Sequence, residues 1–94
     1  MTSSSDDFEA TFPETFLKRF KKLPGNIKQH VRRSVKDILK NPKSCTLLVG
    51  DLSGLWRKKV GKYRIIYEVD WDNRVVFFHD VGPRKTIYRR VKRK

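Results

Sequence analysis

Four basic residues lie on two consecutive predicted strands, with Arg57, Lys58 and Lys59 in residues 55–60 and Arg64 in residues 63–69. Because successive side chains of a strand point to opposite faces, Arg57 and Lys59 share one side of the first strand. Arg64 is predicted to face outward from the second strand, beside a short turn that makes the two strands antiparallel. These three cations are therefore expected to converge on one uncovered sheet surface. Such a cluster can bind a phosphodiester and stabilise the negative charge that builds up on phosphorus during its cleavage.

The C-terminal segment of the chain adds more basic residues and a tyrosine. After the last predicted strand, the chain is expected to return to the rim of this surface and to bring Arg84 and Tyr88 to it. Basic side chains with an aromatic ring between them suit a single-stranded polynucleotide, because they combine phosphate pairing with base stacking. The basic side chains that we expect to contact RNA phosphates, besides Arg57, are Lys58, Lys62, Lys85, Arg89 and Arg90.

The overall charge supports a polyanionic partner. The 94 residues include 23 Lys and Arg against 10 Asp and Glu, which gives a formal net charge of +13 at pH 7. Bases are densest at the C-terminus, where seven fall within residues 84–94. Self-repulsion at that density lowers stability, so a nucleic-acid partner is the favoured explanation. A basic surface laced with ion pairs is the alternative, and ten acids are too few to pair these bases.

Several other classes of protein do not fit this sequence. It has no apolar run near the ~20 residues of a membrane span, and its polar, acidic start is unlike a signal peptide. A single cysteine, Cys45, cannot form an internal disulfide, and with only two histidines it makes no Cys–His metal cluster. We therefore expect a cytoplasmic protein that needs neither a metal nor a cofactor.

The periodicity of apolar residues predicts an α+β fold. Residues 8–12 alternate as in a short strand, a first helix begins near Pro13, and a second helix carries one apolar face and ends at Asn41-Pro42. The strands over 55–60, 63–69 and 75–78 then form a meander. We predict a helical hairpin packed on one face of a twisted antiparallel sheet, with the other face partly open.

One domain accounts for nearly the whole chain. Residues 1–7 lack any periodicity and are expected to form a frayed N-terminus, whereas residues 8–94 are expected to form a single domain with a basic C-terminal tail.

The order of motifs resembles the RelE branch of the RelE/ParE superfamily of toxins from toxin–antitoxin modules. The resemblance covers about residues 8–88 and is carried by five segments in order, which are Phe16–Pro24, Ile38–Pro42, Leu52–Arg57, Val60–Val69 and Val81–Arg89. It implies a fold like that of the small microbial ribonucleases. It also implies a ribosome-dependent endoribonuclease that needs no metal, cuts mRNA in the ribosomal A site and is inhibited by an acidic RelB-like antitoxin.

The resemblance implies a role for each candidate catalytic residue. In this hypothesis the ribose 2′-hydroxyl attacks the adjacent phosphate, and Lys59 is the titratable side chain that can act as the base. Arg64 binds the phosphate, Arg84 stabilises the leaving oxygen, and Tyr88 stacks on a base. Arg64 is also expected to contribute little to stability, because an outward-facing charge seldom does.

Two other functions remain open at this point. One is a non-catalytic protein that binds RNA or the ribosome through the same basic surface. The other is a gyrase inhibitor of the ParE type, which shares the fold but generally lacks the full set of basic residues and the tyrosine.

Overall fold

The computed structural model describes residues 7–91. The predicted frayed start at residues 1–7 lies outside this range apart from Asp7, and so does the end of the basic tail, residues 92–94. The elements in chain order are β1 (Glu9–Thr11), α1 (Glu14–Lys21), α2 (Gly25–Lys40), the 3-10 turn η2 (Pro42–Ser44), β2 (Thr46–Leu47), the 3-10 turn η3 (Gly50–Leu52), β3 (Trp56–Val60), β4 (Tyr63–Asp70), β5 (Val75–Pro83) and α3 (Arg84–Val91).

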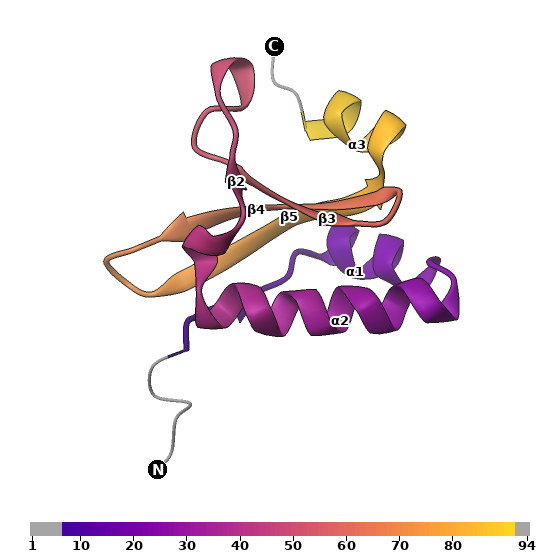
Figure 1. Ribbon diagram of the computed structural model, residues 1–94, viewed down its shortest axis with the longest axis horizontal. Coiled ribbons are helices and arrows are strands. Elements are labelled where there is room, and N and C mark those ends of the chain that lie inside the picture. Colours follow the sequence, from indigo (N-terminus) through magenta and orange to yellow (C-terminus); the bar gives the residue numbers. More distant parts are fainter. Residues whose placement is uncertain (1–6, 92–94) are drawn as a thin grey trace.

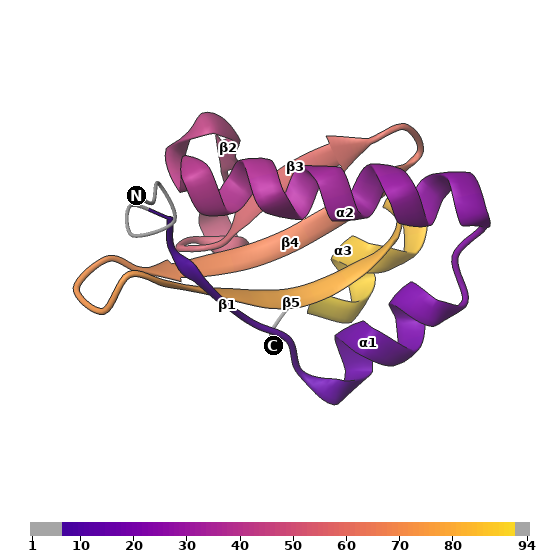
Figure 2. The same ribbon diagram turned by 90° about the horizontal axis from the view of Figure 1, so that it is seen from below.

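The strands form one mixed sheet in the order β1-β5-β4-β3-β2. The predicted meander is present, because β3, β4 and β5 pair antiparallel with their neighbours along the chain. The N-terminal strand departs from the predicted antiparallel sheet, since β1 pairs parallel with β5, starting at Glu9 opposite Val75. The two helices between β1 and the meander carry the chain across the sheet, which allows a parallel pair to form (Figure 2).

The two N-terminal helices cover one face of the sheet, as predicted, and α3 lies on the opposite face (Figure 1). Phe16 of α1 and both Val31 and Ile38 of α2 are buried in the core between these helices and the sheet. Ile65 of β4 and Phe78 of β5 are fully buried in the same core. Burial of such side chains contributes roughly 1.5–3 kcal/mol each. None of the helices within residues 7–91 is long and apolar enough to span a membrane.

The second face of the sheet is more covered than the sequence predicted. Strand β5 continues to Pro83 instead of ending at Phe78, and α3 begins directly after it. The chain therefore folds back over the sheet as a helix rather than passing along its rim (Figure 1). Ile66 of β4 and Ile87 of α3 are both fully buried, so this face holds a small apolar core of its own.

A buried tyrosine joins the middle of the sheet to the end of α2. Tyr67 of β4 is fully buried, and its hydroxyl donates a hydrogen bond of 2.8 Å to the backbone oxygen of Pro42 in η2. Burial raises the pKa of the Tyr67 hydroxyl above its ordinary value, and the neighbouring Cys45 adds to the shift. The folded protein therefore keeps this proton at a pH at which the unfolded chain releases it.

Replacing Tyr67 with Phe should lower stability and remove part of its dependence on alkaline pH. Loss of the hydrogen bond to Pro42 should cost about 0.5–1.5 kcal/mol of the free energy of unfolding at neutral pH. Above the ordinary tyrosine pKa of ~10, the unfolded wild-type chain binds fewer protons than the folded one, so wild-type stability falls as the pH rises. Denaturant unfolding at a series of pH values should show a shallower fall in Tyr67→Phe. Parallel curves for the two proteins would contradict this account.

Candidate active site

The pairing of β3 with β4 brings three of the predicted cationic side chains to the same face. Lys59 lies directly opposite Arg64, and Arg57 lies directly opposite Ile66. Directly opposed residues of an antiparallel pair project to one side of the sheet, with Cβ atoms about 4.5–5.5 Å apart. Since Ile65 of β4 faces α1 and α2, its neighbours Arg64 and Ile66 face α3. The three cations thus gather on the α3 side of the sheet.

Helix α3 adds the tyrosine to this group. Nη1 of Arg57 donates a hydrogen bond of 3.4 Å to the hydroxyl oxygen of Tyr88. The contact joins residues that are 31 positions apart, so it depends on the way α3 folds back over β3. Nε of Arg57 is buried and has no hydrogen-bond partner in the part of the chain that the structure describes. A buried donor without a partner is a candidate ligand for an anion.

Arg64 is buried, which corrects the expectation that it faces solvent. Only 8% of the residue is exposed, because α3 begins beside it at the end of β5, where Gly82 is its cross-strand neighbour. Its Nη1 donates hydrogen bonds of 2.9 Å to the backbone oxygen of Gly61 and 2.8 Å to that of Tyr63. Its Nε is buried and lacks a partner within residues 7–91. The guanidinium is therefore fixed on one side by the turn.

The turn between β3 and β4 is the element that holds Arg64. Gly61 has φ of +61°, a left-handed conformation that glycine adopts without strain. This conformation is the one that a tight two-residue hairpin needs at its first central position. The backbone oxygen of the next residue, Lys62, accepts a hydrogen bond of 2.9 Å from the backbone nitrogen of Arg84. The same turn thus positions both Arg64 and the first residue of α3.

The other predicted phosphate-binding residues fall into two groups. Lys62, Arg84, Lys85 and Arg89 are exposed around the turn and along α3. Lys58 points to the opposite face, because it pairs with the core residue Ile65, and it lines a polar cleft beside α2. Lys58 is therefore not part of the group on the α3 side.

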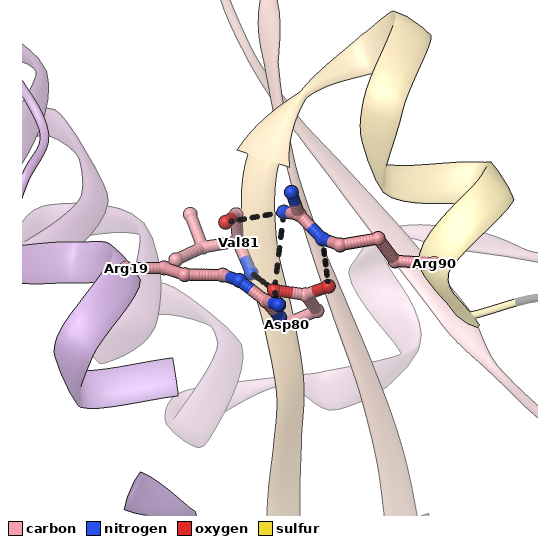
Figure 3. A network of polar contacts seen from close by, with 4 residues as sticks. All are labelled: Arg19, Asp80, Val81 and Arg90. Carbon is pink, nitrogen blue, oxygen red and sulfur yellow. Dashed lines mark hydrogen bonds and ion pairs between the residues drawn. The ribbon is translucent and has the colours of Figure 1, made fainter. Parts of the chain in front are cut away.

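Arg90 has a structural partner that sequence reasoning missed. Its guanidinium forms an ion pair with the buried carboxylate of Asp80 in β5, with Nε 2.9 Å from Oδ2 (Figure 3). The sequence predicted a phosphate contact for Arg90 and did not predict this ion pair. The signal was present in the sequence, since Asp80 is the one acid in the apolar run Val75–Val81 and a buried carboxylate requires a cation.

The three cations from β3 and β4 lack acidic partners within residues 7–91. The ion pairs formed within residues 7–91 include none with Arg57, Lys59 or Arg64. Their charges are therefore not neutralised internally. A bound phosphate would supply the missing negative charge and could accept hydrogen bonds from the guanidinium groups in a bidentate geometry. Chemically, this arrangement can hold a phosphodiester and stabilise a dianionic transition state.

Comparison with known proteins places the chain in a family. A sequence profile described as the ParE-like toxin of type II bacterial toxin–antitoxin systems matches residues 11–92. The chain belongs to the RelE/ParE superfamily of toxins of type II toxin–antitoxin systems.

Individual relatives agree with this assignment. The chain is similar to Toxin RelE3 of Methanocaldococcus jannaschii, with 32% identity over 83 residues, or 82% of this chain and 91% of that protein. A solved structure of the RelBE2 toxin–antitoxin complex of Mycobacterium tuberculosis contains a chain with 25% identity and a TM-score of 0.76, covering 83% of this chain and 92% of the other. A chain of the E. coli RelBE complex has the same fold, with a TM-score of 0.72 at 23% identity over 81% of this chain and 95% of the other.

Replacing Arg64 with Ala should destabilise the fold, in contrast to the same change at its exposed cross-strand neighbour Lys59. The Arg64→Ala variant loses the two hydrogen bonds to the turn and leaves a cavity, so its free energy of unfolding should fall by about 1–3 kcal/mol. Lys59→Ala should stay within about 0.5 kcal/mol of the wild type. Denaturant unfolding of both variants measures the difference. Equal stabilities would mean that the buried guanidinium contributes nothing to the fold.

Proposed function

We propose that this toxin is a ribosome-dependent, metal-independent endoribonuclease that cuts mRNA in the ribosomal A site and so inhibits translation in the cytoplasm. The observation that carries the proposal is the group of cations without acidic partners, Arg57, Lys59 and Arg64, beside the hydroxyl of Tyr88. Tyrosine and arginine also occur together at protein interfaces, so the gyrase alternative is tested separately below. An RNA phosphate with a neighbouring base needs both features.

The proposed reaction is an attack by the ribose 2′-hydroxyl on the adjacent phosphorus. The bond between O2′ and phosphorus forms while the bond from phosphorus to O5′ breaks, leaving a cyclic phosphate and a 5′-hydroxyl. Lys59 takes the proton from the 2′-hydroxyl as the general base. The 5′ oxygen receives a proton from solvent or from an acid of the RNA-bound complex, so protons balance.

The remaining residues stabilise and align the phosphate in this mechanism. Arg57 and Arg64 donate hydrogen bonds to the non-bridging oxygens, on which negative charge builds up. Arg84, at the start of α3, stabilises the leaving 5′ oxygen. Tyr88 stacks on a base next to the cut and keeps the attacking and leaving oxygens in line. The exposed basic side chains around the turn and along α3 contact flanking phosphates; these are Lys62, Lys85 and Arg89.

We also infer that an acidic antitoxin binds this toxin. Solved relatives include toxin–antitoxin complexes, among them RelBE2 of M. tuberculosis and RelBE of E. coli. The net charge of +13 favours an acidic partner, because electrostatic attraction speeds the encounter and relieves self-repulsion.

Replacing Lys59 with Ala should abolish most of the cleavage without affecting the fold. Removal of a general base typically lowers a rate by about 10²–10⁴-fold. Primer extension on mRNA from translating ribosomes would report cuts within codons at the A site. Lys36→Ala is the matched control, because Lys36 is an exposed lysine on α2, on the other side of the sheet.

The same assay separates the alternatives. Translation arrest without cuts in the mRNA would favour a non-catalytic ribosome-binding protein. Gyrase-dependent DNA breaks, tested in parallel, would favour a gyrase inhibitor of the ParE type. Unchanged cleavage by Lys59→Ala would exclude Lys59 as the base.

RNA binding should weaken with rising salt, and Arg57 should account for part of the slope. Each phosphate of a single strand that a cation neutralises adds about −0.7 to the slope of log K against log salt concentration. The Arg57→Ala variant should therefore show a slope smaller by about 0.7 in fluorescence-anisotropy titrations with a short RNA. Lys36→Ala should keep the wild-type slope. An identical slope for Arg57→Ala would mean that Arg57 does not touch a phosphate.

A further inference from the structure

Asp80 of β5 is a buried carboxylate held by donors from three directions. Only 3% of its side chain is exposed. Nη1 of Arg19 in α1 lies 3.0 Å from Oδ1, and Nε of Arg90 in α3 lies 2.9 Å from Oδ2 (Figure 3). The backbone nitrogen of Val81 donates a further bond of 2.8 Å to Oδ1. A carboxylate removed from water is stable only when it is paired and hydrogen-bonded in this way.

The two arginines belong to helices on opposite faces of the sheet. Arg19 reaches Asp80 from α1 and Arg90 reaches it from α3, so one carboxylate fastens both helices to β5 (Figure 3). Arg90 is the more extensively bound of the two, because its Nη2 also donates bonds of 3.4 Å to Oδ1 of Asp80 and 3.3 Å to the backbone oxygen of Val81. Removing Arg90 should therefore release α3 and leave α1 attached.

Besides this attachment, the described residues of helix α3 are held at few points, mainly the buried Ile87 and the bond from Arg57 to Tyr88. The helix has eight residues, which is too short for an isolated helix to be stable in water. Among its residues 84–90, only Ile87 is fully buried. Its first residue is fixed by the bond from the Arg84 nitrogen to Lys62, and its last turn is fixed by Arg90. Tyr88 lies between these two points.

We propose that Asp80 is a positioning residue. It acts through Arg90 to hold α3 in the position at which the Tyr88 hydroxyl accepts the hydrogen bond from Arg57. Arg90 lies two positions after Tyr88. Holding its guanidinium therefore fixes the orientation of this helical turn, and its distance from the sheet, at the residue that carries the hydroxyl. The catalytic consequence rests on the proposed ribonuclease function. The attachment of α3 itself does not depend on that function.

Gly82 makes the contact possible and provides a selective way to disturb it. A Cβ atom at Gly82 would overlap Nη2 of Arg90, whereas the other glycines within residues 7–91 have open space at that position. Since φ of Gly82 is not in the left-handed region, an alanine strains no backbone there. The Gly82→Ala substitution therefore displaces the Arg90 guanidinium while both charges of the pair remain in the chain.

Amide hydrogen exchange of the full-length protein tests the attachment without any need for activity. Arg90→Ala and Gly82→Ala should speed exchange in α3 by roughly ten- to hundred-fold, the equivalent of one charged hydrogen bond. In Arg90→Lys, the exchange rate of α3 should lie between those of the wild type and Arg90→Ala, because an ammonium keeps the charge but loses the planar, bidentate geometry of the guanidinium. Arg19→Ala is the matched control, which should speed exchange in α1 and leave α3 as in the wild type. Unchanged exchange of α3 in both Arg90→Ala and Gly82→Ala would overturn the proposal.

Cleavage kinetics on programmed ribosomes then test the positioning role. Gly82→Ala should lower kcat about ten-fold with little change in KM, because the misplaced α3 affects alignment more than binding. Arg19→Ala should cleave at the wild-type rate. If Arg90 instead contacts RNA, freeing its guanidinium in Gly82→Ala would strengthen RNA binding and leave kcat intact, which would refute the positioning role. If the wild-type toxin does not cleave at all, the ribonuclease function fails, and the exchange data still decide whether Asp80 holds α3.

Discussion

The two-residue turn between β3 and β4 is the constraint on which the candidate site depends. Its first residue, Gly61, adopts a left-handed conformation and offers its backbone oxygen to the Arg64 guanidinium. Its second residue, Lys62, offers its oxygen to the backbone nitrogen at the start of α3. The turn also sets the register that places Lys59 opposite Arg64. A change in the length of this loop would shift strand pairing, the buried cation and α3 together.

The alternation of side chains along β4 divides the protein into two unequal cores. Ile65 and Tyr67 point into the larger core beneath α1 and α2, whereas Arg64 and Ile66 point toward α3. The stabilisation from the larger core offsets the electrostatic cost of the site. Clustered cations repel one another, and a buried guanidinium loses its hydration. A polyanion bound on the α3 side would relieve both costs. The same physical conditions that weaken the free protein therefore favour the binding of a polyanion, such as the RNA of the proposed function or an acidic antitoxin.

Local patterns in the sequence predict the parts of this structure that depend on local physics. Apolar periodicity predicts α2, β3 and β4, and strand parity predicts that Arg57, Lys59 and Arg64 share a face. The parallel neighbour of β1, the helix α3 and the burial of Arg64 follow instead from contacts between distant parts of the chain. The pattern of Val75–Phe78 gave no reason to extend β5 to Pro83, yet that extension is what allows α3 to cover Arg64.

The comparison of Arg64 with Arg90 shows why charge alone does not define the site. Both are arginines on the α3 side of the sheet, and the sequence predicted that both contact a phosphate group. The guanidinium of Arg90 is taken up by Asp80, whereas that of Arg64 bonds only to backbone oxygens within residues 7–91 and keeps its charge unneutralised. What distinguishes the face beneath α3 is burial together with the lack of an acid, because Arg57 and Arg64 each hold a buried Nε without a partner within residues 7–91. On that criterion the face beneath α3, and not the basic C-terminal helix as a whole, is the part of this toxin suited to bind a phosphodiester.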